Sequence, residues 1–281
     1  MLMGSADIIP GVSGGTIALI TGIYEQLIFS LSAVFSAENL RLLRQGRIDL
    51  IWKRINGPFL LSVMTGILAS IFLLARLISW LFHHYPLLVW AFFFGLIAAS
   101  GLFLLRKTGL TAGAMAGWVL LGAALALAIT FIRPAPSTDD HLSWWALFGG
   151  GMAASIAMIL PGISGSYILI LLGMYRAVLE KVKQLDIIPL LVFTAGVVVG
   201  LGGFSKFLKW LFARYEKQTL AVLGGFLLGS LGMVWPWKND YRPVWPRAYD
   251  GDPQYGWVIF WMLTGFAVVW LIEKAARRYG N

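Results

Sequence analysis

Long uncharged apolar blocks are the feature that most constrains how this chain can fold. The blocks Phe59 to Ala75, Leu87 to Leu105 and Trp257 to Ile272 each approach the roughly 20 residues that a helix needs to cross about 30 Å of hydrocarbon. Charged residues make up only 12% of the 281 positions, whereas about a quarter of a soluble globular chain is charged. We therefore expect an all-α polytopic membrane protein without a separate domain outside the bilayer.

An internal repeat organises the chain. The sequence IPGVSGGT at residues 9–16, the first turn, recurs 151 positions later as LPGISGSY at residues 160–167, the second turn. A second block recurs at a separation of 130 positions and places Arg76 on Lys206, and a weaker third block places Gly117 on Gly256. Duplicated folds of this kind are common among membrane transporters.

The proline and glycines of each turn break the helix at membrane depth. Backbone groups freed in this way are tolerated there only where protein or a watery cavity surrounds them, which favours a turn that re-enters the membrane. Three crossings would then follow each turn, and an odd number inverts the second half relative to the first. If the broken segments crossed instead, each half would have four crossings and the repeat would be parallel. The distribution of lysine and arginine does not separate these alternatives.

The expected architecture is therefore two inverted-topology repeats, each a re-entrant helical hairpin plus three transmembrane helices. The first repeat spans residues 1–136, with a re-entrant segment at 5–31 and spans near 58–82, 86–105 and 111–132. The second spans residues 137–281, with a re-entrant segment at 145–176 and spans near 187–212, 218–235 and 256–273.

The two turns are the candidate anion sites. Successive glycines and serines let several backbone N–H groups point at one spot, and the helix that follows adds the positive end of its dipole. The candidate residues are Ser13, Gly14, Gly15 and Thr16 in the first turn, and Ser164, Gly165 and Ser166 in the second. The alternative is that small residues at these positions only allow helices to pack closely.

Four charged residues are further candidates. The repeat-equivalent cations Arg76 and Lys206 either neutralise an anionic head group from two sides or extend to the interface, since each lies just before an aromatic cluster. The acids Asp7 and Glu25 flank the first turn, and we consider them as proton carriers or as solvated interfacial groups.

Composition excludes several other classes of function. The net charge of +9 comes from lysine and arginine beside apolar blocks, where they orient the chain and meet anionic lipid rather than nucleic acid. Because the chain has no cysteine and its three histidines lie outside both turns, we expect no metal site and no cofactor. A lipid-phosphate phosphatase would need a nucleophile with an acid–base partner, and no such pattern is visible.

The first turn and its flanks resemble a known family. Residues 4–16, GSADIIPGVSGGT, followed by Gly22-Ile23-Tyr24-Glu25, resemble the N-terminal signature of the bacterial polyprenyl-phosphate transporters, and residues 161–166 resemble that family's second signature. The chain begins only three residues before Gly4, so we expect the arm leading into the first turn to be short or incomplete.

The resemblance implies a carrier, not an enzyme. Such a carrier returns undecaprenyl phosphate from the outer to the inner leaflet of the bacterial cytoplasmic (inner) membrane, so that the lipid can be reused in cell-envelope synthesis. We expect alternating access, with the phosphate held between the two turns and the prenyl tail left in lipid. The implied partners are undecaprenyl phosphate and membrane lipids. The alternatives are a small-anion transporter or channel and, less favoured, the phosphatase.

Overall fold

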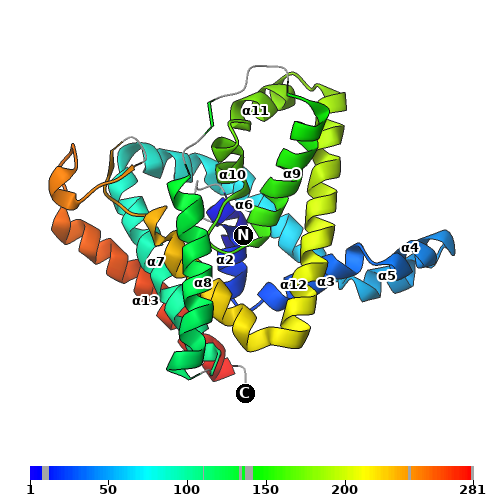
Figure 1. Ribbon diagram of the computed structural model, residues 1–281, viewed down its shortest axis with the longest axis horizontal. Coiled ribbons are helices and arrows are strands. Elements are labelled where there is room, and N and C mark those ends of the chain that lie inside the picture. The colour runs from blue at the N-terminus through cyan, green and yellow to red at the C-terminus, as the bar shows by residue number, and fades with distance from the viewer. Residues whose placement is uncertain (8–12, 110, 133–134, 137–141, 240–241, 280–281) are drawn as a thin grey trace.

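The computed structural model describes residues 1–7, 13–109, 111–132, 135–136, 142–239 and 242–279 (Figure 1). The first turn is therefore described from Ser13 onward, and His141 lies outside the described residues. Apart from one pair of two-residue strands, the regular structure in this part of the chain is helical. The expected all-α class is confirmed.

The helices of the first half are short around the turn and long after it. They are α1 (Leu2–Asp7), α2 (Gly14–Ile20), α3 (Tyr24–Val34), α4 (Ala37–Arg44), α5 (Ile48–Arg54), α6 (Gly57–His84), α7 (Pro86–Lys107) and α8 (Ala112–Phe131).

The second half repeats the plan. It contains α9 (Trp144–Ile159), α10 (Gly165–Leu171), α11 (Tyr175–Lys183), α12 (Ile187–Gly229), the 3₁₀ turns η1 (Ser230–Gly232) and η2 (Pro246–Ala248), the antiparallel strands β1 (Lys238–Asn239) and β2 (Arg242–Pro243), and α13 (Tyr255–Tyr279).

Five of the described helices are long and apolar enough to cross a membrane: α6, α7, α8, α12 and α13. Helix α12 has 43 residues. At about 1.5 Å per residue it is roughly twice as long as the hydrocarbon is thick. It is interrupted at Tyr215, whose backbone is not helical (φ −138°, ψ 46°). The chain is thus a multi-pass membrane protein, and two crossings by α12 would give the six spans that we expect.

The sequence repeat is also a repeat of backbone conformation. Tyr85 separates α6 from α7 with φ −134° and ψ 47°, nearly the angles of its repeat equivalent Tyr215. After the turns, Gly22 and Gly173 have positive φ angles of 77° and 68°, respectively. The two halves therefore fold alike locally, while re-entry and inversion stay predictions.

Close packing is duplicated as well. A Cβ atom built on Gly4 of α1 would lie 2.1 Å from Ser70 Oγ on α6, and one built on Gly200 of α12 would lie 2.2 Å from Ser155 Oγ on α9. Gly4 matches Ser155 at the separation of 151, and Ser70 matches Gly200 at the separation of 130. The same contact therefore occurs in both halves. In the first half the glycine lies on the helix before the turn, α1, and in the second half it lies on the long helix, α12.

The last helix of each half packs on the other half. Helix α13 lies against α7, where a Cβ on Gly95 would meet the Met262 carbonyl oxygen at 1.8 Å. Helix α8 lies against the second part of α12, where a Cβ on Gly225 would meet the Val119 oxygen at 2.1 Å. Because Gly95 and Gly225 are repeat equivalents, these contacts make Val119 the equivalent of Met262. The third sequence block instead aligns Val119 with Val258, which lies about one helical turn earlier. The halves are interlocked rather than side by side.

The largest buried cluster in the described part of the chain surrounds α2 and α3. It includes Ile17 and Ala18 of α2, Ile28 of α3, Ile97 of α7 and Leu227 of α12. Helix α6 instead exposes large apolar side chains such as Phe72, as a lipid-facing helix should. The fold thus holds the turns in the protein interior.

Candidate functional site

The two turns, far apart in the sequence, are in direct contact. The Gly162 N–H donates to Thr16 Oγ1 at 2.8 Å, and the Ser13 hydroxyl donates to the Met158 carbonyl oxygen at 3.1 Å. Close by, the Tyr24 hydroxyl donates to the Ile159 oxygen at 3.2 Å. The structure therefore brings the two groups of candidate residues together at the junction of the halves.

The first turn is occupied by a carboxylate of the same chain. Ser13 caps α2 by accepting a hydrogen bond from the Gly15 N–H at 3.1 Å, and the Gly14 N–H donates to Asp7 Oδ1 at 2.6 Å. The other oxygen, Asp7 Oδ2, is buried and has no hydrogen-bond partner among the described residues. Asp7 thus lies where the anion hypothesis would place a phosphate oxygen.

The second turn differs at this position. The residue equivalent to Asp7 is Met158, which brings no charge. Helix α10 has no side-chain cap from its N-cap residue Ser164, and the Ser164 and Ser166 hydroxyl oxygens are 2.7 Å apart. In the described part of the chain, the second turn therefore has no carboxylate of its own.

The glycines of both turns are needed for packing. A Cβ on Gly15 would lie 2.7 Å from the Ile159 carbonyl oxygen, and one on Gly165 would lie 2.6 Å from the Ala154 oxygen. These approaches are shorter than real Cβ contacts, and the obstacle is backbone rather than a flexible side chain. The packing interpretation holds for Gly15 and Gly165, and anion binding by their N–H groups stays a hypothesis.

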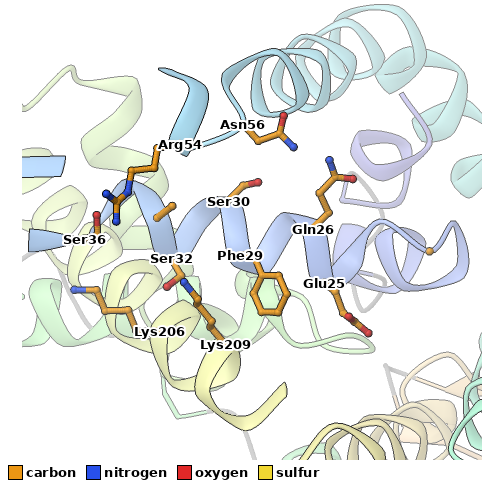
Figure 2. A pocket seen from close by; sticks show the side chains of 12 residues that line it. Glu25, Gln26, Phe29, Ser30, Ser32, Ser36, Arg54, Asn56, Lys206 and Lys209 are labelled. Carbon is orange, nitrogen blue, oxygen red and sulfur yellow. The ribbon is translucent and has the colours of Figure 1, made fainter. Parts of the chain in front are cut away.

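An open cavity of about 740 Å³ lies beside α3, between α5 and α12 (Figure 2). The residues that line it are Gly22, Glu25, Gln26, Phe29, Ser30, Ser32, Ala33, Ser36, Arg54, Asn56, Lys206 and Lys209. It therefore contains two of the sequence candidates, Glu25 and Lys206. Asp7 and Arg76 do not line it, and Arg76 lies exposed on α6.

Positive charge gathers at one end of the cavity. Figure 2 shows the three cations around Ser32 and Ser36; they are Lys206, Lys209 and Arg54. The acid and the two amides lie toward the other end; they are Glu25, Gln26 and Asn56. The Lys209 Nζ lies 5.9 Å from the centroid of the Phe29 ring, within cation–π range.

Arg54 also pairs with Glu38 outside the cavity, and this hydrogen-bonded contact holds the pKa of the Glu38 carboxyl below its ordinary value. Sequence analysis missed both Arg54 and Lys209. Lys209 could have been found, because it follows Lys206 by three positions and so shares its helix face. Arg54 left no such signal, since only the tertiary packing brings it to α12.

Comparison with known proteins identifies the family. Residues 3–248 match the family described as VCA0040-like, undecaprenyl phosphate translocase-like. The chain belongs to this family. The resemblance stated from the turns is confirmed, and the family is one of transporters rather than enzymes.

Two curated relatives are similar over most of their length. A polyprenyl-phosphate transporter of Vibrio cholerae serotype O1 is 43% identical over 239 residues, which cover 85% of this chain and 76% of the relative. A polyprenyl-phosphate transporter of Staphylococcus aureus is 34% identical over 261 residues, which cover 86% of each chain. No solved structure matches this chain.

Proposed function

We propose that this chain transports a polyprenyl phosphate across the bilayer, moving undecaprenyl phosphate from the outer to the inner leaflet of the bacterial cytoplasmic membrane. The observation that carries the proposal is the contact between two helix-breaking turns from opposite halves, sealed by the Gly162 N–H to Thr16 bond. The curated relatives, both named polyprenyl-phosphate transporters, support the substrate class.

Dehydrating the phosphate is the main barrier that such a carrier must lower. A phosphate monoester carries about −1.5 to −2 charges at neutral pH, and hydrocarbon cannot replace its water. N–H groups and hydroxyls at the turns can do so, because they are held in the interior in fixed directions. In our proposal Ser13, Thr16, Ser164 and Ser166 contribute hydroxyls, and the glycines contribute N–H groups.

Asp7 must leave its position for the first turn to accept a phosphate. Its carboxylate and the substrate would compete for the same Gly14 N–H. Protonation of Asp7 would weaken its hydrogen bond and release the donor, which would couple a proton to the movement of the phosphate. Glu25, at the cavity, is the second proton-carrier candidate. In this proposal the two acids couple proton movement to phosphate transport, and neither catalyses a covalent reaction.

The cations are proposed to act from the two sides. Lys206 faces the cavity beside α3, and its repeat equivalent Arg76 would meet the head group on the opposite side once access alternates. The prenyl tail stays in lipid throughout, along exposed apolar surfaces such as that of α6 around Phe72 and Leu73.

A phosphatase-accessibility assay tests the proposal. The protein is reconstituted into phosphatidylcholine vesicles that contain undecaprenyl phosphate, and alkaline phosphatase is added outside. Protein-free vesicles should lose only the outer-leaflet phosphate, whereas the transporter should expose the inner-leaflet pool as well. In parallel, vesicles loaded with inorganic phosphate test the small-anion alternative. Release of inorganic phosphate without any gain in lipid hydrolysis would replace the proposed function with that alternative.

A further inference from the structure

We propose that the cavity between α3, α5 and α12 binds phosphate monoesters, with Lys206 and Lys209 as the residues that contact the phosphate, at a site separate from the two turns. The inference rests on the proposed function for the source of the ligand, the head group of a polyprenyl phosphate. It follows from the charge, the lining and the position of the cavity.

The charge of the lining fits an anion. Three cations and one carboxylate line the cavity. Arg54 is matched by Glu38, whereas Lys206 and Lys209 form no ion pair within the described part of the chain. Two unmatched ammonium groups are close to the charge of about −1.5 to −2 that a phosphate monoester carries at neutral pH.

The cation end of the cavity also contains hydroxyl groups, and the lysines there extend from a helix whose neighbouring residues are buried. Lys206 and Lys209 lie three positions apart on α12, next to Ser205 and Leu208, which are buried. Across from them, α3 presents Ser32, which is 5% exposed, and Ser36, the N-cap residue of α4, also lines the cavity. Because the two lysines share one helix face, a single phosphate can contact both.

The volume predicts what else the site admits. A cavity of about 740 Å³ is far larger than one phosphate group, since one water occupies roughly 30 Å³ of liquid. The head group would therefore bind with part of its hydration shell, through charge more than through shape. A diphosphate should bind at least as tightly as a monophosphate.

The position connects the cavity to the turns. Helix α2 runs from its cap Ser13, in contact with the second turn, to the loop where Gly22 lines the cavity. Its seven residues span only about 10 Å at roughly 1.5 Å per residue. A head group released from the turns would thus reach the Glu25 end of the cavity within one short helix length, and the lysines lie at the other end of the same cavity (Figure 2).

The test is calorimetric titration of the purified full chain in a nonionic detergent. The probes are geranylgeranyl phosphate, inorganic phosphate and uncharged geranylgeraniol. Lys206→Gln/Lys209→Gln should bind geranylgeranyl phosphate about thirtyfold more weakly, because two charge-assisted contacts are lost. Lys206→Arg/Lys209→Arg, which keeps the charge, should bind like the wild type. Lys217→Gln, an exposed residue of the same helix outside the cavity, is the matched control, and thermal unfolding confirms that each variant is folded.

Each result decides between the alternatives. Binding by the folded double Gln variant within about threefold of the wild type would overturn the site, as would equal wild-type affinity for geranylgeraniol. Lysine-dependent binding of inorganic phosphate as tight as that of the lipid would keep the anion site and reject the lipid as its particular ligand. If phosphatase accessibility shows no transport while lysine-dependent binding persists, the proposed function fails and the site stands. Normal transport with lysine-independent binding would overturn the site and leave the proposed function standing.

Discussion

The first and second turns have nearly the same sequence but different surroundings. At the first, the Asp7 carboxylate accepts the Gly14 N–H at 2.6 Å. At the second, the equivalent residue is Met158, and Ser164 and Ser166 are hydrogen-bonded to each other. A repeated motif therefore does not make two equal sites, because a residue seven positions before Gly14 decides whether the turn already holds an anion.

The loops inserted in the two halves also differ in what they contribute to the cavity. The first half carries α4 and α5, a basic helical pair that projects from the body of the molecule (Figure 1) and contributes Arg54 to the cavity. The second half carries the antiparallel strands β1 and β2, and Lys238 of β1 lies over the Trp90 ring near the start of α7. Only the first half thus gains a cation for the cavity from its insertion.

The orientation of the halves gives the largest expected effect, an all-or-none result. Because the chain has no cysteine, Gln45→Cys after α4 and Gln184→Cys after α11 each create a single exposed thiol. If the repeats are inverted, a membrane-impermeant maleimide should label the two variants from opposite sides of the membrane. Labelling of both variants from the same side would show that the repeat is parallel. The two turns could then not serve opposite sides of the membrane.

The turn glycines give the next largest effect. Gly165→Ala would place a Cβ 2.6 Å from a backbone oxygen, whereas Gly14→Ala would place one 2.5 Å from Asp7 Oδ2, which can rotate away. We expect Gly165→Ala to cost about 1–3 kcal/mol of stability and most of the transport, and Gly14→Ala to cost clearly less. Thermal unfolding and phosphatase accessibility measure the two quantities. The reverse order would mean that the first turn is the more tightly packed one.

Asp7→Asn gives a smaller effect, chiefly on affinity. It replaces a charge-assisted hydrogen bond by a neutral one but also removes a buried charge with one unpartnered oxygen, so stability should change by less than about 1 kcal/mol. Removal of the competing anion should raise the affinity for geranylgeranyl phosphate a few-fold. Glu180→Gln, which removes an exposed acid of α11 outside the cavity, is the control for a general charge effect. Lower affinity in Asp7→Asn would show that Asp7 helps to bind the substrate and does not compete with it.

Lys238 gives the smallest effect on transport, because it lies outside both turns and does not line the cavity. Burial lowers its pKa to about 7, although the Nζ donates to the Met233 carbonyl and lies 3.5 Å from the centroid of the Trp90 ring. An unfolded lysine titrates near pH 10.4, so between about pH 7 and pH 10 the unfolded chain binds more protons. Stability should therefore rise with pH in this window, by at most about 1.4 kcal/mol per pH unit.

Lys238→Met should remove that rise, and Lys217→Met should not. The measurement is the difference in unfolding temperature between pH 7 and pH 9 for the wild type and both variants. An unchanged difference in Lys238→Met would mean that Lys238 stays charged over Trp90 throughout this range.

Much of the fold could be predicted from the sequence. The apolar blocks fix which segments are long helices, and the motif at residues 9–16 and 160–167 locates the repeat. The candidate site was predicted only in part. Lys206 and Glu25 do line one cavity, but Arg76 does not, and Lys209 and Arg54 were missed. The equivalence of α8 and α13 also differed by a turn from the sequence match, because the close contacts of Gly95 and Gly225 decide it.

The sequence by itself determined the helices, the duplication and the family, since these depend on the order of residues over short distances. The tertiary structure decided that the two turns contact each other and that Arg54 lines the same cavity as Lys206. The physical reason is that the contacts between the turns and around the cavity join segments more than a hundred positions apart, and helix packing sets their geometry. The local sequence around each lysine or arginine does not indicate which of them helix packing will bring to the same cavity.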